Sequence, residues 1–263
     1  MADFTNQQFD LTGKVAIVTG AGGRGNSIGR AYAIALANAG ASVVVADLNG
    51  EGARRVADEI VGAGKKAIAV QADIVDEASV AAMAKAAEDA FGGIDILVNN
   101  AALMVEICDG TPLIGLDRAG FDRAIAVNVW GAVNCSQAVV ASMAARGGGA
   151  IINQISAGAF PAQTTYGVTK LALAAVTTTL ATELGHQNIR VNAIAPGITQ
   201  TDAGTSLTPD DSAWTQGVMA RSPISGRDTP DALCGALLLL VSPAGRWMTG
   251  QILNVDGGYI MRT

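Results

Sequence analysis

Short apolar runs alternate with longer helix-like segments along almost the whole chain. Because these runs lack the polar alternation of half-exposed strands, each predicts a strand that is buried on both faces. The predicted strands are residues 14–19, 42–46, 67–71, 94–99, 150–155, 189–195 and 251–255. The segments between them predict helices near residues 27–40, 50–63, 76–91, 118–146, 164–185 and 229–241.

Strands separated by helical crossovers predict right-handed β–α–β units. The expected fold is therefore α/β, with a doubly wound, seven-stranded parallel sheet covered by helices on both faces. No Pro/Ser-rich linker divides the chain, so residues 1–263 are predicted to form one domain, with a polar tail over residues 1–9. Residues 199–227 contain Pro, Gly, Asp and Thr, which predicts an irregular, mobile lid over the functional site.

Composition narrows the range of partners. The 263 residues are 50% apolar, enough for a sizeable core, and 17 basic against 23 acidic residues give a net charge of −6. No basic run could neutralise a phosphate backbone, so nucleic acid is not expected to bind. The strongly apolar stretch 236–241 is far shorter than the roughly 20 residues that span a bilayer, so we expect a cytoplasmic protein without membrane contact. Three widely spaced cysteines without a CxxC pair predict neither disulfides nor a metal site.

Polar or small residues gather where the predicted strands end. In a doubly wound sheet the ligand crevice lies beyond the carboxyl ends of the strands, where the strand order reverses. The strand interiors are nearly all Val, Ile, Leu and Ala, whereas the strand ends carry Gly20, Asp47, Asp73, Asn99, Asn100, Ser156, Pro196 and Gly197. These residues are therefore the first candidates for binding and chemistry.

A glycine-rich loop follows the first strand. It runs Thr19-Gly-Ala-Gly-Gly-Arg-Gly-Asn-Ser-Ile-Gly29 and leads into a predicted helix. Glycines let a backbone approach a pyrophosphate, and free N–H groups at the positive end of a helix dipole favour its charge. The loop thus predicts a dinucleotide site, although a glycine-rich turn without a ligand is the alternative. The expected contacts in this loop are Gly20, Asn26, Ser27 and Ile28.

A carboxylate at the end of the second strand favours NAD over NADP. Asp47 stands 18 residues after the loop, where it can accept hydrogen bonds from the adenosine ribose and would repel a 2′-phosphate. Arg24, Arg54 or Arg55 could instead reach a 2′-phosphate, which keeps NADP as the less favoured alternative. Asp47 could also simply cap the following helix.

The ends of the third and fourth strands add further candidates. Asp73 could hydrogen-bond the adenine amino group, or it could cap the next helix. Asn100 can tie neighbouring strand ends together while small residues leave room for ribose and nicotinamide, with a plain turn as the alternative. The other cofactor contacts expected at these strand ends are Leu48, Ile74, Ala101 and Ala102.

Tyr166 and Lys170 lie four positions apart at the start of a predicted helix, so their side chains share one face. A free phenol titrates near about pH 10, but a neighbouring ammonium and an oxidised nicotinamide both favour the phenolate and lower its pKa. Tyr166 is thus a candidate base for an alcohol O–H, or acid for a carbonyl, as hydride moves to or from a nicotinamide. An ordinary surface pair is the alternative.

Two other polar residues could assist this chemistry. Ser156 follows the fifth strand and can donate a hydrogen bond to a substrate oxygen, unless it is only a turn hydroxyl. Asn128 interrupts an apolar helical stretch, where its side chain competes with backbone hydrogen bonds and could open the helix to hold a water. A helix kink without function is the alternative for Asn128.

Taken together, these motifs resemble the short-chain dehydrogenase/reductase family, in its branch of about 250 residues with a single Rossmann-type domain. The resemblance extends from Lys14 to Tyr259. It is carried by Thr19-Gly20, Ile28-Gly29, Asp47, Asp73, Asn99-Asn100-Ala101, Asn128, Ser156, Tyr166 with Lys170, Arg190-Val-Asn192, Pro196-Gly197 and Asp256-Gly257-Gly258.

The resemblance implies a role for each candidate. Tyr166 would be the catalytic acid/base, Ser156 would orient and polarise the substrate oxygen, and Lys170 would lower the tyrosine pKa and bind the nicotinamide ribose. Asn128 would hold a water in a proton relay behind Lys170. The resemblance also implies a homotetramer, and nicotinamide-end contacts from Tyr166, Lys170, Pro196, Gly197, Ile198, Thr199 and Thr201.

The glycine-rich loop departs from the family pattern. Three additional residues lie between Gly20 and Gly29, and Ser27 stands where the middle glycine is expected. A longer loop ending in Ser-Ile is also similar to enoyl reductases of the same superfamily. Those enzymes space their Tyr and Lys more widely than the three intervening residues found here, so carbonyl or alcohol chemistry is favoured.

Two further positions also depart from the pattern. Ser156 lies ten residues before Tyr166, a shorter distance than is usual in the family, which a trimmed loop over residues 158–163 would accommodate. Ala102 replaces the glycine that usually follows Asn-Asn-Ala.

These features predict an NAD-dependent oxidoreductase that interconverts a secondary alcohol and a ketone. An NADPH-dependent ketoreductase of the 3-oxoacyl-carrier type is the alternative within the enzyme class, and a non-catalytic dinucleotide-sensing protein is the alternative outside it. Residues 199–227, including Trp214, and residues 103–116 are expected to form the pocket for a small-molecule substrate. Their Leu, Ile, Met, Val and Trp side chains suggest an apolar ring or chain.

Overall fold

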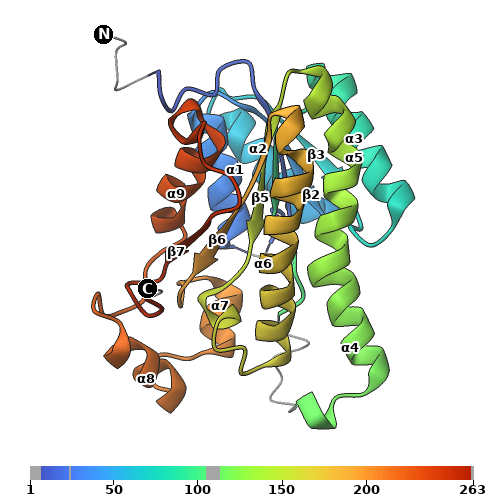
Figure 1. Cartoon of the computed structure of the whole chain (residues 1–263). Coiled ribbons are helices and arrows are strands. Elements are labelled where there is room, and N and C mark those ends of the chain that lie inside the picture. Colours follow the sequence, from blue (N-terminus) through green and yellow to red (C-terminus); the bar gives the residue numbers. More distant parts are fainter. Residues whose placement is uncertain (1–6, 24, 105–112, 262–263) are drawn as a thin grey trace.

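Seven parallel strands form one sheet in the computed structural model, which describes residues 7–23, 25–104 and 113–261 (Figure 1). The sheet order is β3-β2-β1-β4-β5-β6-β7. All the strands predicted from the apolar runs are present, with ends that differ by at most two residues, and the predicted fold class is confirmed. The strands are β1 (Val15–Thr19), β2 (Ser42–Asp47), β3 (Ala67–Gln71), β4 (Ile96–Asn99), β5 (Gly149–Gln154), β6 (Ile189–Pro196) and β7 (Ile252–Val255).

Helices cover both faces of this sheet (Figure 1). Alternate strand residues point to opposite faces: Val18 and Val43 pack in one core cluster with α1, α2 and α9, whereas Ile17 and Val44 pack in another with α3 and α5. The covering helices are α1 (Ile28–Asn38), α2 (Gly50–Gly62) and α9 (Asp231–Val241) on one face, and α3 (Glu77–Phe91), α5 (Gly131–Ala145) and α6 (Thr165–Leu184) on the other.

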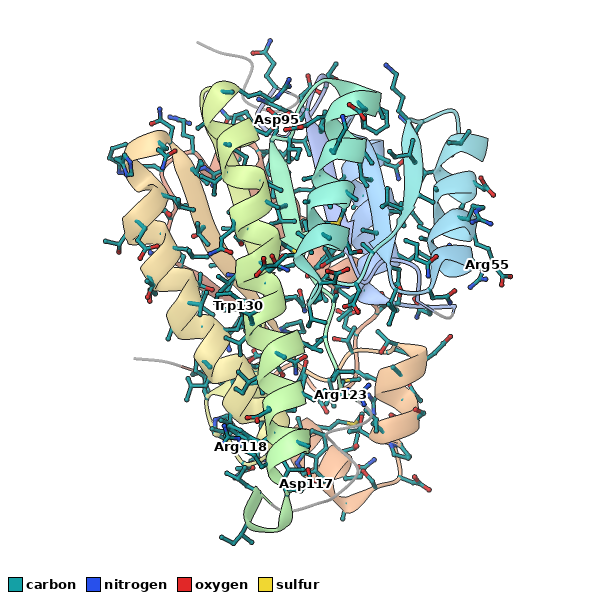
Figure 2. All side chains as sticks on the ribbon, turned by 90° about the vertical axis from the view of Figure 1, so that its right-hand side faces the viewer. Arg55, Asp95, Asp117, Arg118, Arg123 and Trp130 are labelled. Carbon is teal, nitrogen blue, oxygen red and sulfur yellow. The ribbon has the colours of Figure 1, made fainter. Side chains whose placement is uncertain are left out.

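The amino ends of the central strands are closed by a buried carboxylate. Asp95 pairs with Lys14 (3.1 Å) and Arg146 (2.9 Å) and accepts a hydrogen bond from the Val15 N–H. Burial by itself would raise the pKa of Asp95, but the hydrogen bonds from these three partners lower it overall. Figure 2 shows Asp95 at one end of the molecule and Asp117 at the other. Because Asp95 directly precedes β4, this anchor lies at the amino ends of the strands, opposite to their carboxyl ends.

The helix predicted over residues 118–146 is a rod of three pieces: α4 (Arg118–Ile125), a π-helical turn (Ala126–Trp130) and α5 (Figure 1). By length and mean hydropathy, Arg118–Ala145 is the one described helix that could cross a membrane. However, α5 packs against α3, and its buried Asn134 donates a hydrogen bond to the Ile74 carbonyl (2.9 Å). The rod therefore serves as a core helix of the α/β fold.

Residues 199–227, the lid segment, are more regular than the sequence predicted. They contain α7 (Asp202–Leu207) and α8 (Ala213–Arg221), which corrects the expectation of an irregular segment. The hydroxyl residues that indicated loops are helix caps instead: Thr201 caps α7 and Ser212 caps α8 through their side-chain oxygens.

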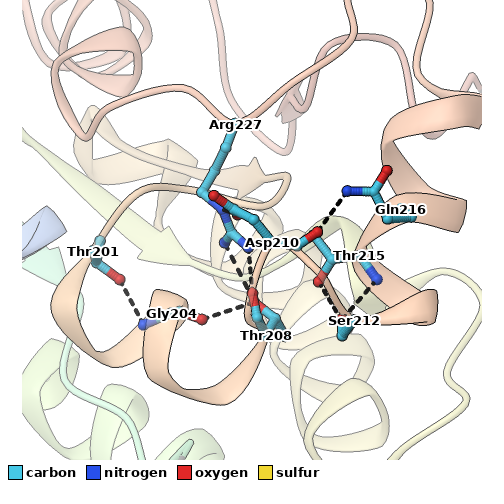
Figure 3. Close-up of polar contacts among 8 residues, drawn as sticks. All are labelled: Thr201, Gly204, Thr208, Asp210, Ser212, Thr215, Gln216 and Arg227. Atoms are coloured by element: carbon cyan, nitrogen blue, oxygen red, sulfur yellow. Dashed lines mark hydrogen bonds and ion pairs between the residues drawn. The ribbon is translucent and has the colours of Figure 1, made fainter.

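A buried guanidinium holds the connection between the two lid helices (Figure 3). The side chain of Arg227 is only 5% exposed; it pairs with Asp210 (2.8 Å) and donates to the backbone carbonyl of Thr208. The hydroxyl of Thr208 in turn donates to the Gly204 carbonyl (2.7 Å) inside α7. Arg227 thus fixes the connection between α7 and α8.

Candidate active site

The carboxyl ends of β1 and β4 meet where the strand order reverses. Asn100 donates its side-chain N–H groups to the carbonyls of Thr19 (3.0 Å) and Gly20 (2.9 Å), so it ties the two strand ends together as the sequence predicted. A Cβ on Gly20 would lie 2.6 Å from the Cα of Ala101. Only glycine allows this approach. The strand order reverses between β1 and β4, which is where doubly wound sheets bind their ligands.

The glycine-rich loop places the start of α1 against the end of β1. A Cβ on Gly29 would overlap the Gly20 carbonyl, so the helix can approach the strand only because residue 29 is glycine. The Ser27 Oγ accepts a hydrogen bond from the Arg30 N–H (3.3 Å) and caps α1, with Ile28 as the first helical residue. The serine that replaces the expected glycine is therefore a helix cap.

Asp47 binds the loop rather than the next helix. Its carboxylate accepts hydrogen bonds from the N–H groups of Gly22 (2.8 Å) and Asn49 (2.8 Å). The cap of α2 is Asn49, whose Oδ1 accepts from the Gly52 N–H (3.1 Å), so the helix-cap alternative for Asp47 is wrong. The carboxylate stays partly exposed beside Leu48, at the mouth of the glycine-rich loop.

The arginines that could reach a 2′-phosphate differ in their surroundings. Arg24 lies outside the described residues. Arg55 projects from the outer side of α2 (Figure 2) and pairs with Glu51 one turn away, at 3.5 Å. Arg54 is exposed on the same helix. The described part of α2 therefore presents no arginine that is held against the Asp47 carboxylate.

Asp73, like Asp47, does not cap the helix that follows it. Its Oδ1 accepts from the Val75 N–H (3.1 Å), which closes a small turn after β3, while Asp76 caps α3 through the Ala78 N–H (3.1 Å). The helix-cap alternative for Asp73 is therefore wrong.

Ile74, the next residue, is buried. Its side chain packs against the rod, where a Cβ on Gly131 would lie 2.5 Å from it.

Lys170 is the most unusual charged group of the site. Its side chain is 1% exposed, and its Nζ donates a hydrogen bond to the backbone carbonyl of Gln154 (2.7 Å). The same nitrogen lies 5.5 Å from the centroid of the Tyr166 ring, so the predicted side-by-side arrangement is present. Burial lowers the pKa of the Lys170 ammonium to about 7, because the charged form loses its hydration.

Gln154 links this lysine to the helix at the glycine-rich loop. Its backbone accepts from Lys170, while its buried side-chain Oε1 accepts from the hydroxyl of Tyr32 (2.7 Å) on α1. Tyr32 is fully buried, and desolvation raises its pKa well above the ordinary value. Tyr32 is therefore a neutral hydrogen-bond donor in the core, and it joins the two halves of the site.

Asn128 opens the helical rod, as predicted, because it lies in the π-helical turn. Its side chain makes no direct hydrogen bond to Lys170. Instead, it exchanges hydrogen bonds with both backbone groups of Leu103 (2.7 and 2.9 Å) and donates to the Thr169 hydroxyl (3.1 Å). Asn128 thus braces the segment after β4 against α6, next to the candidate catalytic lysine.

Two glycines bring the turn after Ser156 onto the start of α6, the helix that carries Tyr166. A Cβ on Gly167 would lie 2.7 Å from the Gly158 carbonyl, so the turn after Ser156 packs directly on the start of α6. The Ser156 Oγ accepts from the Gly158 N–H (3.1 Å). The turn-hydroxyl alternative therefore describes part of its role, and the O–H remains available as a donor. The short spacing between Ser156 and Tyr166 is accommodated by this tight turn.

The end of β6 leads into the lid segment. The Gly197 N–H donates to the Val255 carbonyl (3.0 Å), and a Cβ on Gly197 would lie 2.8 Å from Asp256, so the chain turns sharply here. The Thr199 hydroxyl donates back to the Gly197 carbonyl (3.3 Å). Pro196 and Ile198 flank Gly197 in this turn, and Thr201 begins α7.

The predicted substrate pocket is described in part. Residues 105–112 of the segment 103–116 lie outside the described residues, as does Cys108 within it. Trp214 is half exposed on α8, in agreement with a place at the surface of the lid segment. Among the residues that the structure describes, no group of three or more His, Cys, Asp or Glu side chains could hold a metal ion.

Sequence reasoning missed the residues that support the site from behind. Gln154 accepts a hydrogen bond from Lys170, and Thr169 accepts one from Asn128. Neither Gln154 nor Thr169 was predicted as a site residue. A usable signal existed for Gln154, because it is a polar residue at the end of a mostly apolar strand. No local pattern indicates that Asp202 of the lid segment accepts a hydrogen bond from Asn26 of the glycine-rich loop, 176 positions earlier.

The residues at the crevice fit a dinucleotide. A Cβ at Gly20, Gly22 or Gly29 would collide with neighbouring parts of the chain, so these glycines let the loop pack closely between the strand ends and the helices. The N–H groups at the start of α1, which follow this loop, are of the kind that favours a pyrophosphate. A carboxylate, Asp47, stands at the second strand end, and a buried amine beside a phenol stands further along the sheet. These are the features that adenosine ribose, pyrophosphate and nicotinamide ribose require.

The fold and the paired Tyr166 and Lys170 define the class: a dehydrogenase or reductase of the doubly wound α/β type. The chain belongs to the short-chain dehydrogenase/reductase family, which confirms the resemblance seen in the sequence. A family model described as enoyl-(acyl carrier protein) reductase matches residues 23–260.

The relatives of this chain include oxidoreductases and dehydrogenases. An uncharacterized oxidoreductase of Mycobacterium tuberculosis is 47% identical over 251 residues, which is 95% of this chain and 98% of the relative. The 7α-hydroxysteroid dehydrogenase of Escherichia coli is 40% identical over 259 residues, 97% of each chain.

Solved structures agree in fold across nearly the whole chain. A 7α-hydroxysteroid dehydrogenase complexed with NADH and 7-oxo glycochenodeoxycholic acid superposes with a TM-score of 0.89, at 39% identity, over 98% of this chain and 99% of that one. A gluconate 5-dehydrogenase of Burkholderia cenocepacia in complex with NADP and tartrate has a TM-score of 0.87, at 34% identity, over 97% and 98% of the two chains.

Proposed function

We propose that this enzyme interconverts a secondary alcohol and a ketone with NAD(H) as its cofactor. The observation that carries the proposal is the Tyr166 phenol, with the buried Lys170 amine 5.5 Å from its ring centroid and the Ser156 turn packed on the same helix start. A phenol that exchanges a proton with an oxygen is the machinery that alcohol and carbonyl chemistry needs. Support also comes from the relatives, of which one acts as a hydroxysteroid dehydrogenase.

Each residue has a separate task in this proposal. Tyr166 takes the proton from the alcohol oxygen, or returns it to the carbonyl oxygen in the reverse direction. Ser156 donates a hydrogen bond to the same oxygen and stabilises the charge that develops on it. Lys170 binds the nicotinamide ribose and, when protonated, favours the phenolate of Tyr166. The bound nicotinamide supplies the hydride acceptor or donor.

NAD is proposed over NADP because of Asp47. Its carboxylate is held at the end of β2 by two backbone N–H groups, where a 2′-phosphate would bring a second negative charge. The gluconate 5-dehydrogenase named above carries NADP, so an NADPH-dependent ketoreductase is the second candidate. The ratio of kcat/KM for the two cofactors distinguishes them, and a preference for NADPH would favour the second candidate.

The substrate is proposed to be a small molecule with a ring-borne or chain-borne secondary alcohol. A panel of alicyclic, aromatic and acyl-linked alcohols should be screened with NAD, with turnover followed by the nicotinamide absorbance. Tyr166→Phe should lower kcat by about 10²- to 10⁴-fold while NADH still binds. Unchanged turnover in this variant would remove the acid/base role, and a protein that binds NADH without turning over any alcohol would fit a dinucleotide sensor.

A cytoplasmic homotetramer and a single domain with a substrate lid are parts of the same proposal. Trp130 is 48% exposed on the outer surface of the π-helical turn (Figure 2), and Leu171 is 44% exposed on α6. Large apolar side chains on neighbouring helices favour a contact between subunits. Light scattering after size-exclusion chromatography measures the number of subunits, and a monomer would overturn this part.

A further inference from the structure

The lid segment is joined to the glycine-rich loop by paired hydrogen bonds. The Asn26 N–H donates to the Asp202 carboxylate (3.2 Å), and the Asp202 N–H donates back to the Asn26 carbonyl (3.1 Å). The Asn26 side chain donates to the carbonyl of Gln200 (2.6 Å). A Cβ on Gly25 would overlap the Asp202 carboxylate, so the loop passes directly under it. We name this contact the loop–lid clasp.

The carboxylate of the clasp lies where an anion is expected to bind. Asn26 directly precedes Ser27, the N-cap of α1, and the free backbone N–H groups of such a helix start favour phosphate oxygens. A carboxylate oxygen accepts the same hydrogen bond from the same N–H group. In the structure, Asp202 occupies the N–H group of Asn26, which stands next to these helix-start groups.

The charge of Asp202 makes this occupancy unfavourable for a cofactor. Among the described residues, which do not include Arg24, no lysine or arginine pairs with Asp202. Its negative charge would therefore stand next to an incoming pyrophosphate without a counter-ion from the described chain. Two unit charges about 4 Å apart in water repel each other by an amount worth roughly fivefold in a dissociation constant.

A cavity of about 510 Å³ opens at the clasp and gives a ligand access to it. Residues from the glycine-rich loop, from the segment just before α7 and from α7 itself line this cavity: Asn26, Gln200, Thr201, Asp202, Thr205 and Ser206.

We propose that Asp202 is a built-in competitor of the dinucleotide phosphate. In the free enzyme its carboxylate occupies the loop, and cofactor binding displaces it together with the start of α7. The displacement reaches the rest of the lid segment because Thr208 and Arg227 brace the end of α7 against the connection to α8 (Figure 3). Cofactor binding and lid position are thereby coupled. The inference rests on the proposed function, because it requires a dinucleotide at this loop.

The test compares Asp202→Asn with a matched control. Asparagine keeps the size of the side chain and can still accept a hydrogen bond, but it lacks the negative charge. Asp211→Asn removes the same charge from the same lid segment. Asp211 is exposed, and its side chain makes no hydrogen bond or ion pair with the described residues. NADH binding is measured by fluorescence titration at low and high ionic strength.

Removing the charge should strengthen cofactor binding. The Kd for NADH is expected to fall about fivefold in Asp202→Asn at low salt, and the gain should shrink at high salt because the repulsion is screened. Asp211→Asn should stay within about twofold of the wild type. Equal or weaker binding by Asp202→Asn would overturn the proposal.

A second measurement follows the clasp itself by hydrogen exchange. ADP-ribose is the probe, because it carries the pyrophosphate without the nicotinamide. In the wild type it should speed amide exchange over residues 202–205. In Asp202→Asn, which keeps the hydrogen bonds of the clasp but lacks the repulsion, the same increase should occur at a lower ADP-ribose concentration. Slower exchange on ADP-ribose binding would also overturn the clasp. If the wild type binds neither NADH, NADPH nor ADP-ribose, the proposed function fails; if it binds them and the variant behaves like wild type, only the clasp fails.

Discussion

Replacing Lys170 by methionine should make the free enzyme more stable at neutral pH. Methionine fills a similar volume but carries no charge, so Lys170→Met removes the cost of burying an ammonium. The pKa of this ammonium falls from an ordinary value of 10.5 to about 7. At about 1.4 kcal/mol for each pKa unit, burying the charged form costs up to about 5 kcal/mol.

The pH dependence of this cost has a defined sign. Between about pH 7 and pH 10.5 the unfolded chain keeps a proton on Lys170 that the folded chain releases, so wild-type stability rises as the pH rises through this range. Below about pH 7 the full cost remains. The variant lacks this rise, and it also loses the hydrogen bond to the Gln154 carbonyl, worth about 1 kcal/mol.

Urea unfolding of the cofactor-free protein measures the difference. Lys170→Met should exceed the wild type by about 3 kcal/mol at pH 7 and match it within about 1 kcal/mol at pH 10. Both proteins are compared at one concentration, because association would add to the apparent stability. Lys65→Met, at an exposed lysine, is the control and should show no such trend. A flat difference between Lys170→Met and wild type across this range would refute the buried-ammonium reasoning.

Two further substitutions test the surroundings of the proposed site. Tyr32→Phe leaves the buried Oε1 of Gln154 without its donor, so the free energy of unfolding should fall by about 1 to 3 kcal/mol in denaturant titrations; an unchanged value would mean that the bond contributes nothing net. Ser156→Ala should lower kcat by about 10²-fold or more while NADH affinity is retained, and a loss confined to KM would instead indicate a role in substrate binding alone.

The strands and their order of appearance could be predicted from the sequence because burial on both faces selects continuous apolar runs. The candidate residues at the strand ends followed from the same pattern, since the sheet geometry places them at one edge. The prediction of an irregular structure for the lid segment was wrong. Its Thr and Ser residues signal loops and helix caps equally well, and only the chain around them decides between the two.

By itself, the sequence determined the α/β class, the glycine-rich loop and the spacing of Tyr166 and Lys170, because each depends on neighbours within a few positions. The tertiary structure decided how far Lys170 is dehydrated, which partners hold Asn128, and that Asp202 reaches the loop. These properties depend on contacts between residues far apart in the chain; Asn26 and Asp202, for example, are 176 positions apart. Local periodicity carries no information about such distances, so only the packed fold defines the charge and hydration of the site.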